Sequence, residues 1–132
     1  MLLGSAIGFE RQWHQKMAGL RTNALVALGA SGFVAFSGMV GAGDPTRVAA
    51  QVVTGIGFLG AGVILRGQGA RVYHLTTAAS LWVTTGVGVL CGLGEWKLAV
   101  VATALVLLVL VIGLRLDRWL YGISGVQDDD RE

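Results

Sequence analysis

Charged residues fall in short clusters along this chain, and long uncharged stretches separate the clusters. Four of these stretches have the length that a helix needs to cross a bilayer, about 17–25 residues. They lie between Arg21 and Asp44, between Arg47 and Arg66, between Arg71 and Glu95, and between Lys97 and Arg115. Because backbone groups in lipid must be hydrogen-bonded within their own segment, each stretch is predicted to be helical. We expect membrane-spanning helices at 22–39, 48–65, 75–93 and 98–114.

The composition supports an integral membrane protein. Of the 132 residues, 54% are hydrophobic and only 14% are charged, whereas an ordinary soluble domain has about 25% charged residues. The 21 glycines suit membrane helices, which use small residues to approach one another closely. Cys91 is the only cysteine, which excludes an intramolecular disulfide and a multi-cysteine metal site. The net charge of +2 gives little support for a nucleic-acid partner, so the lipid bilayer is the expected surrounding.

The N-terminal stretch MLLGSAIGF (1–9) is apolar but too short to cross a bilayer. We interpret it as the cytoplasmic half of a first helix, with an interfacial or re-entrant segment as the alternative. A signal peptide is not indicated, because no basic region precedes the apolar run. The predicted fold is therefore all-α: a polytopic bundle of four full transmembrane helices and a short or truncated first helix. The transmembrane domain is expected at 1–121, followed by an acidic cytoplasmic tail at 122–132.

Lysine and arginine in the connecting segments predict the orientation of the chain. Three of these segments are basic, and they contain Arg11, Lys16 and Arg21, then Arg66 and Arg71, and finally Arg115 and Arg118. The two segments between them hold only Arg47 and Lys97, each with an acidic neighbour. Since short basic loops stay on the cytoplasmic side, we expect a cytoplasmic C-terminus.

Residues 55–60 read GIGFLG, a literal G-x-G-x-x-G. After a strand, such a motif binds the pyrophosphate of a dinucleotide, with an acidic residue about 20 positions later for the ribose. No Asp or Glu occurs between Asp44 and Glu95. The motif is therefore not interpreted as a nucleotide site.

The glycines of this segment are predicted to serve helix packing instead. On a helix, Gly55 and Gly62 share a face with Gln51, while Gly57 and Gly60 lie on the opposite side. We expect other helices to approach closely from two sides. A helix that flanks an ion pathway is the alternative.

Two of the predicted helices carry a stripe of small, weakly polar residues at steps of three and four. One stripe consists of Thr77, Ser80, Thr84, Gly88 and Cys91, and the other of Asn23, Ala27, Ala30, Val34, Ser37 and Gly41. Hydroxyl groups in membrane helices most often bond to their own backbone or join helices together. A helix–helix contact is the first interpretation, and a lined path for an ion is the alternative.

DPTR at 44–47 predicts the capped start of a helix. Asp44 can accept hydrogen bonds from the free N–H groups of the first turn, and the proline that follows suits the first helical position. The alternative is a polar patch of Asp44, Arg47 and Gln51 at the outer mouth of the bundle.

Polar residues also gather near the cytoplasmic ends of the predicted helices. Four of them are expected to form a charge network there: Glu10, Arg11, Arg21 and Asn23. Thr76 and Thr77 follow at the start of a later helix. Their hydroxyls are predicted to cap its free N–H groups, with an anion site as the alternative.

Other chemistry finds little support in the residues. No carboxylate lies at the middle of a predicted span, although a proton-coupled exporter or a carrier of divalent cations usually needs one. His14 and His74 lie near the cytoplasmic interface, and two histidines without neighbouring ligands do not make a metal site. No nucleophile–base pair stands out. We therefore expect no enzyme activity, no metal and no cofactor.

Taken together, four segments resemble the MgtC/SapB family of bacterial inner-membrane proteins. They are GFERQ (8–12), AGLRTNALVALGA (18–30), RVAAQVVTGIGFLGAGVIL (47–65) and LTTAASLW (75–82). The resemblance implies a helical domain in the bacterial inner membrane, with roles in growth under magnesium limitation, in acid stress and in survival inside macrophages. The virulence-associated members look like regulators of other membrane proteins, including the F-type ATP synthase, rather than proven magnesium carriers.

The resemblance also implies which residues matter. Carried over position by position, it points to Glu10, Arg11, Gly19, Arg21, Thr22, Asp44, Arg47, Gln51, Gly55, Gly57, Gly60, Gly62, Thr76 and Thr77. His74 departs from the pattern, because a glycine is expected before the Leu-Thr-Thr. The sequence ends at GVQDDDRE (125–132) without the ACT-like cytoplasmic domain of many members, so we expect a minimal or truncated form.

Two functions therefore remain open. In the first, the protein regulates other membrane proteins by binding them through its exposed helix faces. In the second, it is a small channel or transporter for Mg²⁺ or another ion, with the small-residue stripes forming a path between copies. A homo-oligomer is expected, because four or five thin helices enclose little volume.

Overall fold

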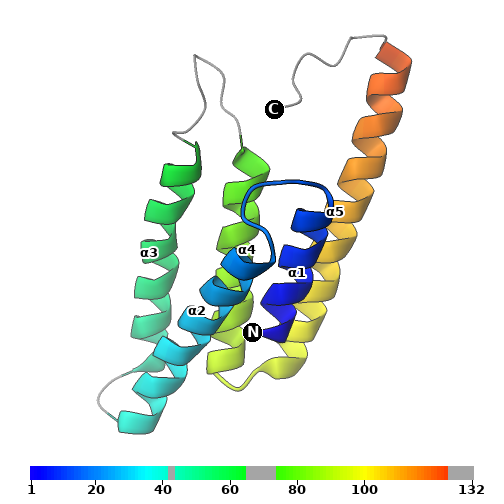
Figure 1. Cartoon of the computed structure of the whole chain (residues 1–132). Coiled ribbons are helices and arrows are strands. Elements are labelled where there is room, and N and C mark those ends of the chain that lie inside the picture. The colour runs from blue at the N-terminus through cyan, green and yellow to red at the C-terminus, as the bar shows by residue number, and fades with distance from the viewer. Residues whose placement is uncertain (42–43, 65–73, 125–132) are drawn as a thin grey trace.

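A computed structural model describes residues 1–41, 44–64 and 74–124, with side chains as far as Leu116. These residues form helices and no strand, which confirms the predicted all-α fold for the described part of the chain. The helices are α1 (Leu2–Trp13), α2 (Leu20–Val40), α3 (Pro45–Ile64), α4 (Leu75–Gly92) and α5 (Trp96–Ser124). Figure 1 shows them as an elongated bundle in which α4 lies between α3 on one side and α1 and α5 on the other.

Four of the helices are long and apolar enough to cross a membrane: α2, α3, α4 and the Trp96–Leu116 part of α5. The 12 residues of α1 extend over about 18 Å at 1.5 Å per residue, roughly half of a hydrocarbon core. The structure therefore has the predicted architecture, with four full spans and a shorter first helix. The last helix continues to Ser124, beyond the expected end of its span at Leu114. Charges such as Arg115 end a membrane span, but they do not end a helix.

Glycines bring α1, α2 and α4 into close contact. A Cβ atom added at Gly4 would lie 2.5 Å from Ala27 Cβ, and one added at Gly88 would lie 2.6 Å from the carbonyl oxygen of Ala27. Gly8 and Gly92 are equally crowded by the backbone of α2, at 2.6 Å and 2.7 Å. The backbones of these helices therefore approach as closely as small residues allow.

The glycines of α3 do not bring helices of the same chain into close contact. A Cβ atom added at Gly55, Gly57 or Gly62 meets nothing within 4 Å, and one added at Gly60 meets only Ala78 Cβ at 3.8 Å. The prediction that helices of the same chain pack closely on two faces of α3 is therefore wrong. The physical reason is position, because α3 lies at the edge of the bundle and buries only Ile56.

The two small-residue stripes face each other across the contact between α2 and α4. Asn23, Ala27, Ala30 and Val34 are buried on α2, and the α4 stripe is buried at Thr77, Ser80, Thr84 and Gly88. Gly88 and Gly92 contact Ala27, Ala30, Ser31 and Val34. This arrangement supports the helix–helix interpretation of the stripes, because small residues of α2 and α4 are in direct contact along them.

A second contact holds α1 and α5 to the same central helix. Ile7, Val87 and Ala99 are buried together, one from each of α1, α4 and α5. The half-buried side chains of Leu3, Leu90 and Cys91 pack around them. A second side of α4 is therefore covered by α1 and α5.

Candidate functional site

A buried polar cluster lies where the last turn of α1 meets the first turn of α4. We call Glu10, Arg11, His14 and Thr77 the Arg11 cluster. Arg11 is 3% exposed and Glu10 is 8% exposed. The Arg11 Nη2 atom donates a hydrogen bond of 2.9 Å to the Thr77 hydroxyl oxygen, and Thr77 is itself 1% exposed. This bond joins α1 to α4 through two residues that are 66 positions apart in the chain.

The other atoms of the cluster are incompletely paired. His14 Nδ1 lies 3.1 Å from Glu10 Oε1, but it also lies 2.9 Å from the backbone carbonyl oxygen of Glu10, one turn earlier. Within the described part of the chain, neither carboxylate oxygen of Glu10 nor Arg11 Nε takes part in a hydrogen bond. Among the described residues, His14 makes the direct contact with the Glu10 carboxylate, and the Arg11 guanidinium acts on it through its charge without a direct ion pair. Buried ions are costly in a protein and in a membrane unless they are paired.

Asn23 and Thr84 form a second buried pair about two turns further along α4. The Thr84 hydroxyl donates to Asn23 Oδ1 over 2.8 Å. The Asn23 amide donates in turn to the carbonyl oxygens of Ala18 and Gly19, which precede α2. Both side chains are fully buried, so the pair fixes the turn between α1 and α2 against α4.

The predicted charge network is therefore real only in part. The structure brings Glu10 and Arg11 together and places Asn23 in the neighbouring pair, but Arg21 is exposed on α2. Its side chain takes no hydrogen bond or ion pair with the described residues. Arg21 is the second residue of α2, and its side chain is turned away from α4.

The predicted capping of α4 by threonine is wrong. The N-cap residue is His74, and no side chain bonds to the free N–H groups there. Thr77 instead accepts the hydrogen bond from Arg11, and Thr76 is exposed. The position of Thr77 at the head of the buried α4 stripe was the sequence signal for a contact with another helix.

At the opposite end of the bundle, Asp44 caps α3 as its sequence predicts. Its Oδ1 accepts the Thr46 backbone N–H at 2.9 Å, and its Oδ2 accepts the Thr46 hydroxyl at 2.7 Å. Arg47 and Gln51 are exposed. The Arg47 backbone N–H donates to the Asp44 carbonyl oxygen at 3.0 Å, but neither side chain is hydrogen-bonded to Asp44 within the described residues. The capped-helix interpretation therefore accounts for this end better than a joined polar patch.

The capping bonds predict a small acid sensitivity. The Thr46 hydroxyl and then the Thr46 backbone N–H lower the pKa of Asp44 below its ordinary value. A lowered pKa in the folded state means that the cap stabilises α3 in full above about pH 4 and loses its effect as the pH falls through the lower, folded value. We expect Asp44→Asn, which keeps an acceptor oxygen, to flatten this part of the thermal stability profile measured by circular dichroism. An unchanged slope between neutral and acidic pH in the variant would contradict the assignment.

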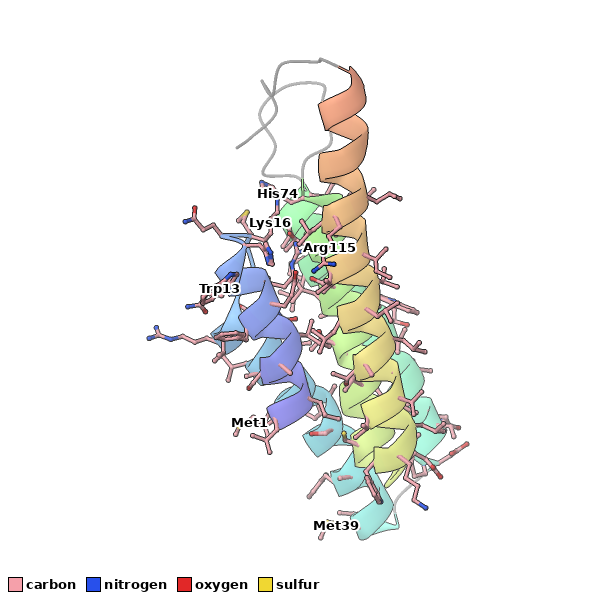
Figure 2. All side chains as sticks on the ribbon, turned by 90° about the vertical axis from the view of Figure 1, so that its right-hand side faces the viewer. Met1, Trp13, Lys16, Met39, His74 and Arg115 are labelled. Carbon is pink, nitrogen blue, oxygen red and sulfur yellow. The ribbon has the colours of Figure 1, made fainter. Side chains whose placement is uncertain are left out.

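The charged ends of the bundle agree with an alternating topology. Figure 2 shows Lys16, His74 and Arg115 at one end, and Met39 at the other. Trp13, which is 75% exposed, lies near the basic end, where tryptophan is common at membrane interfaces. The chain thus has a basic end, which contains the Arg11 cluster, and an opposite end marked by Met39 and Asp44.

The family model of MgtC proteins matches residues 1–119, which is most of the sequence. The chain belongs to the MgtC family. It is thus a multi-pass membrane protein of that family. Gly19, which the resemblance also pointed to, is the N-cap residue of α2, and Thr22 is exposed on that helix.

Curated MgtC proteins are similar to this chain over its greater part. It is 60% identical to Protein MgtC of Salmonella typhimurium strain LT2 over 107 residues, which cover 81% of this chain and 46% of the relative. It is 58% identical to Protein MgtC of Brucella abortus strain 2308 over 109 residues, covering 82% and 45%. The chain thus spans about half the length of these MgtC relatives. No solved structure matches it.

Proposed function

We propose that this MgtC-family chain is an inner-membrane regulator that acts by binding other membrane proteins. Its basic end faces the cytoplasm in this proposal, in line with the distribution of lysine and arginine. The setting is the one that the family resemblance implies: growth under magnesium limitation, acid stress and virulence. The F-type ATP synthase is the proposed partner.

One observation carries this proposal: among the described residues, the hydrogen bonds of the buried polar side chains either join helices or return to the backbone within or just before the same helix. Arg11 is bonded to Thr77 near the basic end, and Asn23 is bonded to Thr84 about two turns further along α4. Further toward the other end, α2 and α4 meet through small residues in direct contact, such as Gly88 against Ala27. An ion would need a continuous series of polar groups or water through such a region.

The outer faces of the helices suit contacts with other membrane proteins. Only 6% of the α3 span and 11% of the Trp96–Leu116 span are buried within the chain. Large apolar side chains point outward from both, including Phe58 at 82% exposure and Val109 at 65%. Partners within a membrane associate through van der Waals packing of such faces.

The first test combines two measurements on the purified chain in vesicles of phosphatidylethanolamine and phosphatidylglycerol. Enclosed indicator dyes report Mg²⁺ and proton entry. Co-reconstitution with purified F-type ATP synthase then reports any change in ATP-driven proton pumping. We expect no ion entry above that of empty vesicles, together with a reduced pumping rate that depends on the amount of the chain added.

The control is an unrelated multi-pass protein at the same protein-to-lipid ratio, which should leave pumping unchanged. Saturable Mg²⁺ or proton entry would replace the regulator with the alternative function, a small oligomeric channel or transporter. Unchanged pumping at every ratio would exclude the ATP synthase as the partner.

A further inference from the structure

An open apolar groove runs between α2 and α3. These helices meet where they are connected and diverge toward their other ends (Figure 1). The groove has a volume of about 390 Å³, and its walls are formed by Leu25, Gly29 and Phe33 of α2 and by Val52, Gly55 and Leu59 of α3. Because both helices are membrane spans, the groove opens sideways into the bilayer.

Glycine leaves the backbone bare on both walls of the groove. A Cβ atom added at Gly29 or at Gly55 meets nothing within 4 Å. A helix that enters the groove can therefore approach the backbones of α2 and α3 as closely as Gly88 approaches α2 within the bundle. The space is suited to a helix surface with protruding side chains, such as Phe58 of α3, which is 82% exposed.

Gln51 lies beside this groove, one turn before Gly55 on the same side of α3. Its side chain is exposed and takes no hydrogen bond with any described residue. At 1.5 Å per residue, its Cα lies about 9 Å along the helix from Pro45, inside the apolar span. An amide surrounded by lipid tails has no hydrogen-bond partner, which is unfavourable in an apolar medium.

We infer that the groove and Gln51 form the contact between two copies of this chain, related by a two-fold axis along the membrane normal. Two copies inserted in the same orientation hold Gln51 at the same depth. A carboxamide both donates and accepts hydrogen bonds, so two Gln51 side chains facing each other across the axis satisfy each other. Such a contact is self-complementary, as in the commonest class of homodimer.

The side-chain amide of Gln51 favours a second copy of the chain over a lipid as the occupant of the groove. An acyl chain fills an apolar groove, but it cannot bond to Gln51. The inference does not depend on whether the chain regulates a partner or conducts an ion, since either function can belong to a dimer. The ion-entry and pumping measurements therefore do not test it.

The test counts copies of the fluorescently labelled full chain in vesicles of phosphatidylethanolamine and phosphatidylglycerol, by stepwise photobleaching over a range of protein densities. We expect dimers for the wild type. Gly55→Leu should raise the dissociation constant at least about tenfold, because a large side chain overpacks the contact. Gln51→Leu should raise it about threefold or more, the size of one interhelical hydrogen bond in a membrane.

Gly57→Leu is the matched control. Gly57 lies on the opposite side of the same helix and also has nothing within 4 Å of an added Cβ, so its substitution should change neither the fold nor the dimer. In a Cys91→Ser background, Gln51→Cys should form an intermolecular disulfide on oxidation. Equal helical circular dichroism and thermal midpoints show that all variants fold.

Three outcomes overturn the inference. One is a single copy per spot at every protein density. Another is an equal loss of dimer in the control and in Gly55→Leu. The third is a single copy that carries a bound phospholipid in native mass spectrometry, which would make the groove a lipid site.

Discussion

Gly88→Leu is expected to be among the most damaging single substitutions in the described part of the chain, together with the same change at the other crowded glycines. A Cβ atom at this position would lie 2.6 Å from Ala27 O and 2.8 Å from Ala30 Cβ. The nearest of these atoms belongs to the backbone of α2, so no side-chain rotation can relieve the clash. Overpacking of an interior typically costs about 1–3 kcal/mol, and leucine adds three more carbons beyond Cβ. We expect a loss of about 3 kcal/mol or more, because α2 and α4 must separate.

The measurement is the free energy of unfolding in mixed micelles, followed by far-UV circular dichroism. Gly86→Leu is the matched control, because it changes the same residue type on the same helix, two positions earlier, where an added Cβ meets nothing within 4 Å. The control should unfold near the wild-type midpoint. If both variants lost equal stability, the cost would come from leucine in α4 generally and not from the contact with α2.

Arg11→Leu is the other substitution with a large expected effect. It removes the hydrogen bond to Thr77 and leaves the carboxylate of Glu10, which is 8% exposed, without the adjacent positive charge. Removal of one partner from a direct buried ion pair costs about 3–5 kcal/mol, because the remaining charge is uncompensated. The Arg11 guanidinium acts on Glu10 through its charge without forming such a pair, so we expect a loss at the lower end of that range, about 3 kcal/mol, at neutral pH, measured by the same unfolding experiment.

The double variant Glu10→Leu/Arg11→Leu separates the two causes. If the lone carboxylate carries the cost, the double variant should recover much of the stability, since an apolar pair often replaces a buried ion pair without loss. Arg21→Leu is the control for loss of an arginine, and its exposed side chain predicts almost no change. Equal effects of Arg11→Leu and Arg21→Leu would show that the Arg11 cluster does not stabilise the fold.

The positions of the helices could be predicted because charges are excluded from the hydrocarbon core. The predicted span at 75–93 differs by one residue from α4, and the span at 22–39 lies within α2. The physical constraint acts locally on each segment, so no knowledge of neighbouring helices is needed. The burial of Thr77, Ser80 and Thr84 follows equally from helical spacing.

The pairing of faces could not be predicted in the same way. Glycines on α3 and on α4 look alike in the sequence, but only Gly88 and Gly92 meet another helix closely. The difference depends on which helix lies in the centre of the bundle, a tertiary property that helical periodicity does not contain. The bond between Arg11 and Thr77 was missed for the same reason, because its partners lie 66 residues apart.

His74 shows how a departure from a family pattern acquires a physical meaning. The expected residue before the Leu-Thr-Thr is glycine, and the structure places His74 in the left-handed region, with φ of 64°. Glycine adopts this region without strain, whereas other residues do so at a cost of about 1 kcal/mol or more. The expectation of a glycine thus reflects backbone geometry at the start of α4.

The burial of Glu10 and Arg11 also sets an order of events during synthesis. α1 is synthesised before α4, so both charges are at first exposed. Thr77, which accepts the hydrogen bond from Arg11, follows 66 positions later. A charge that lies next to lipid is unfavourable until it is paired or covered by protein. The Arg11 bond can therefore form only after α4 has been translated, so α1 reaches its final packing later than its place in the sequence implies.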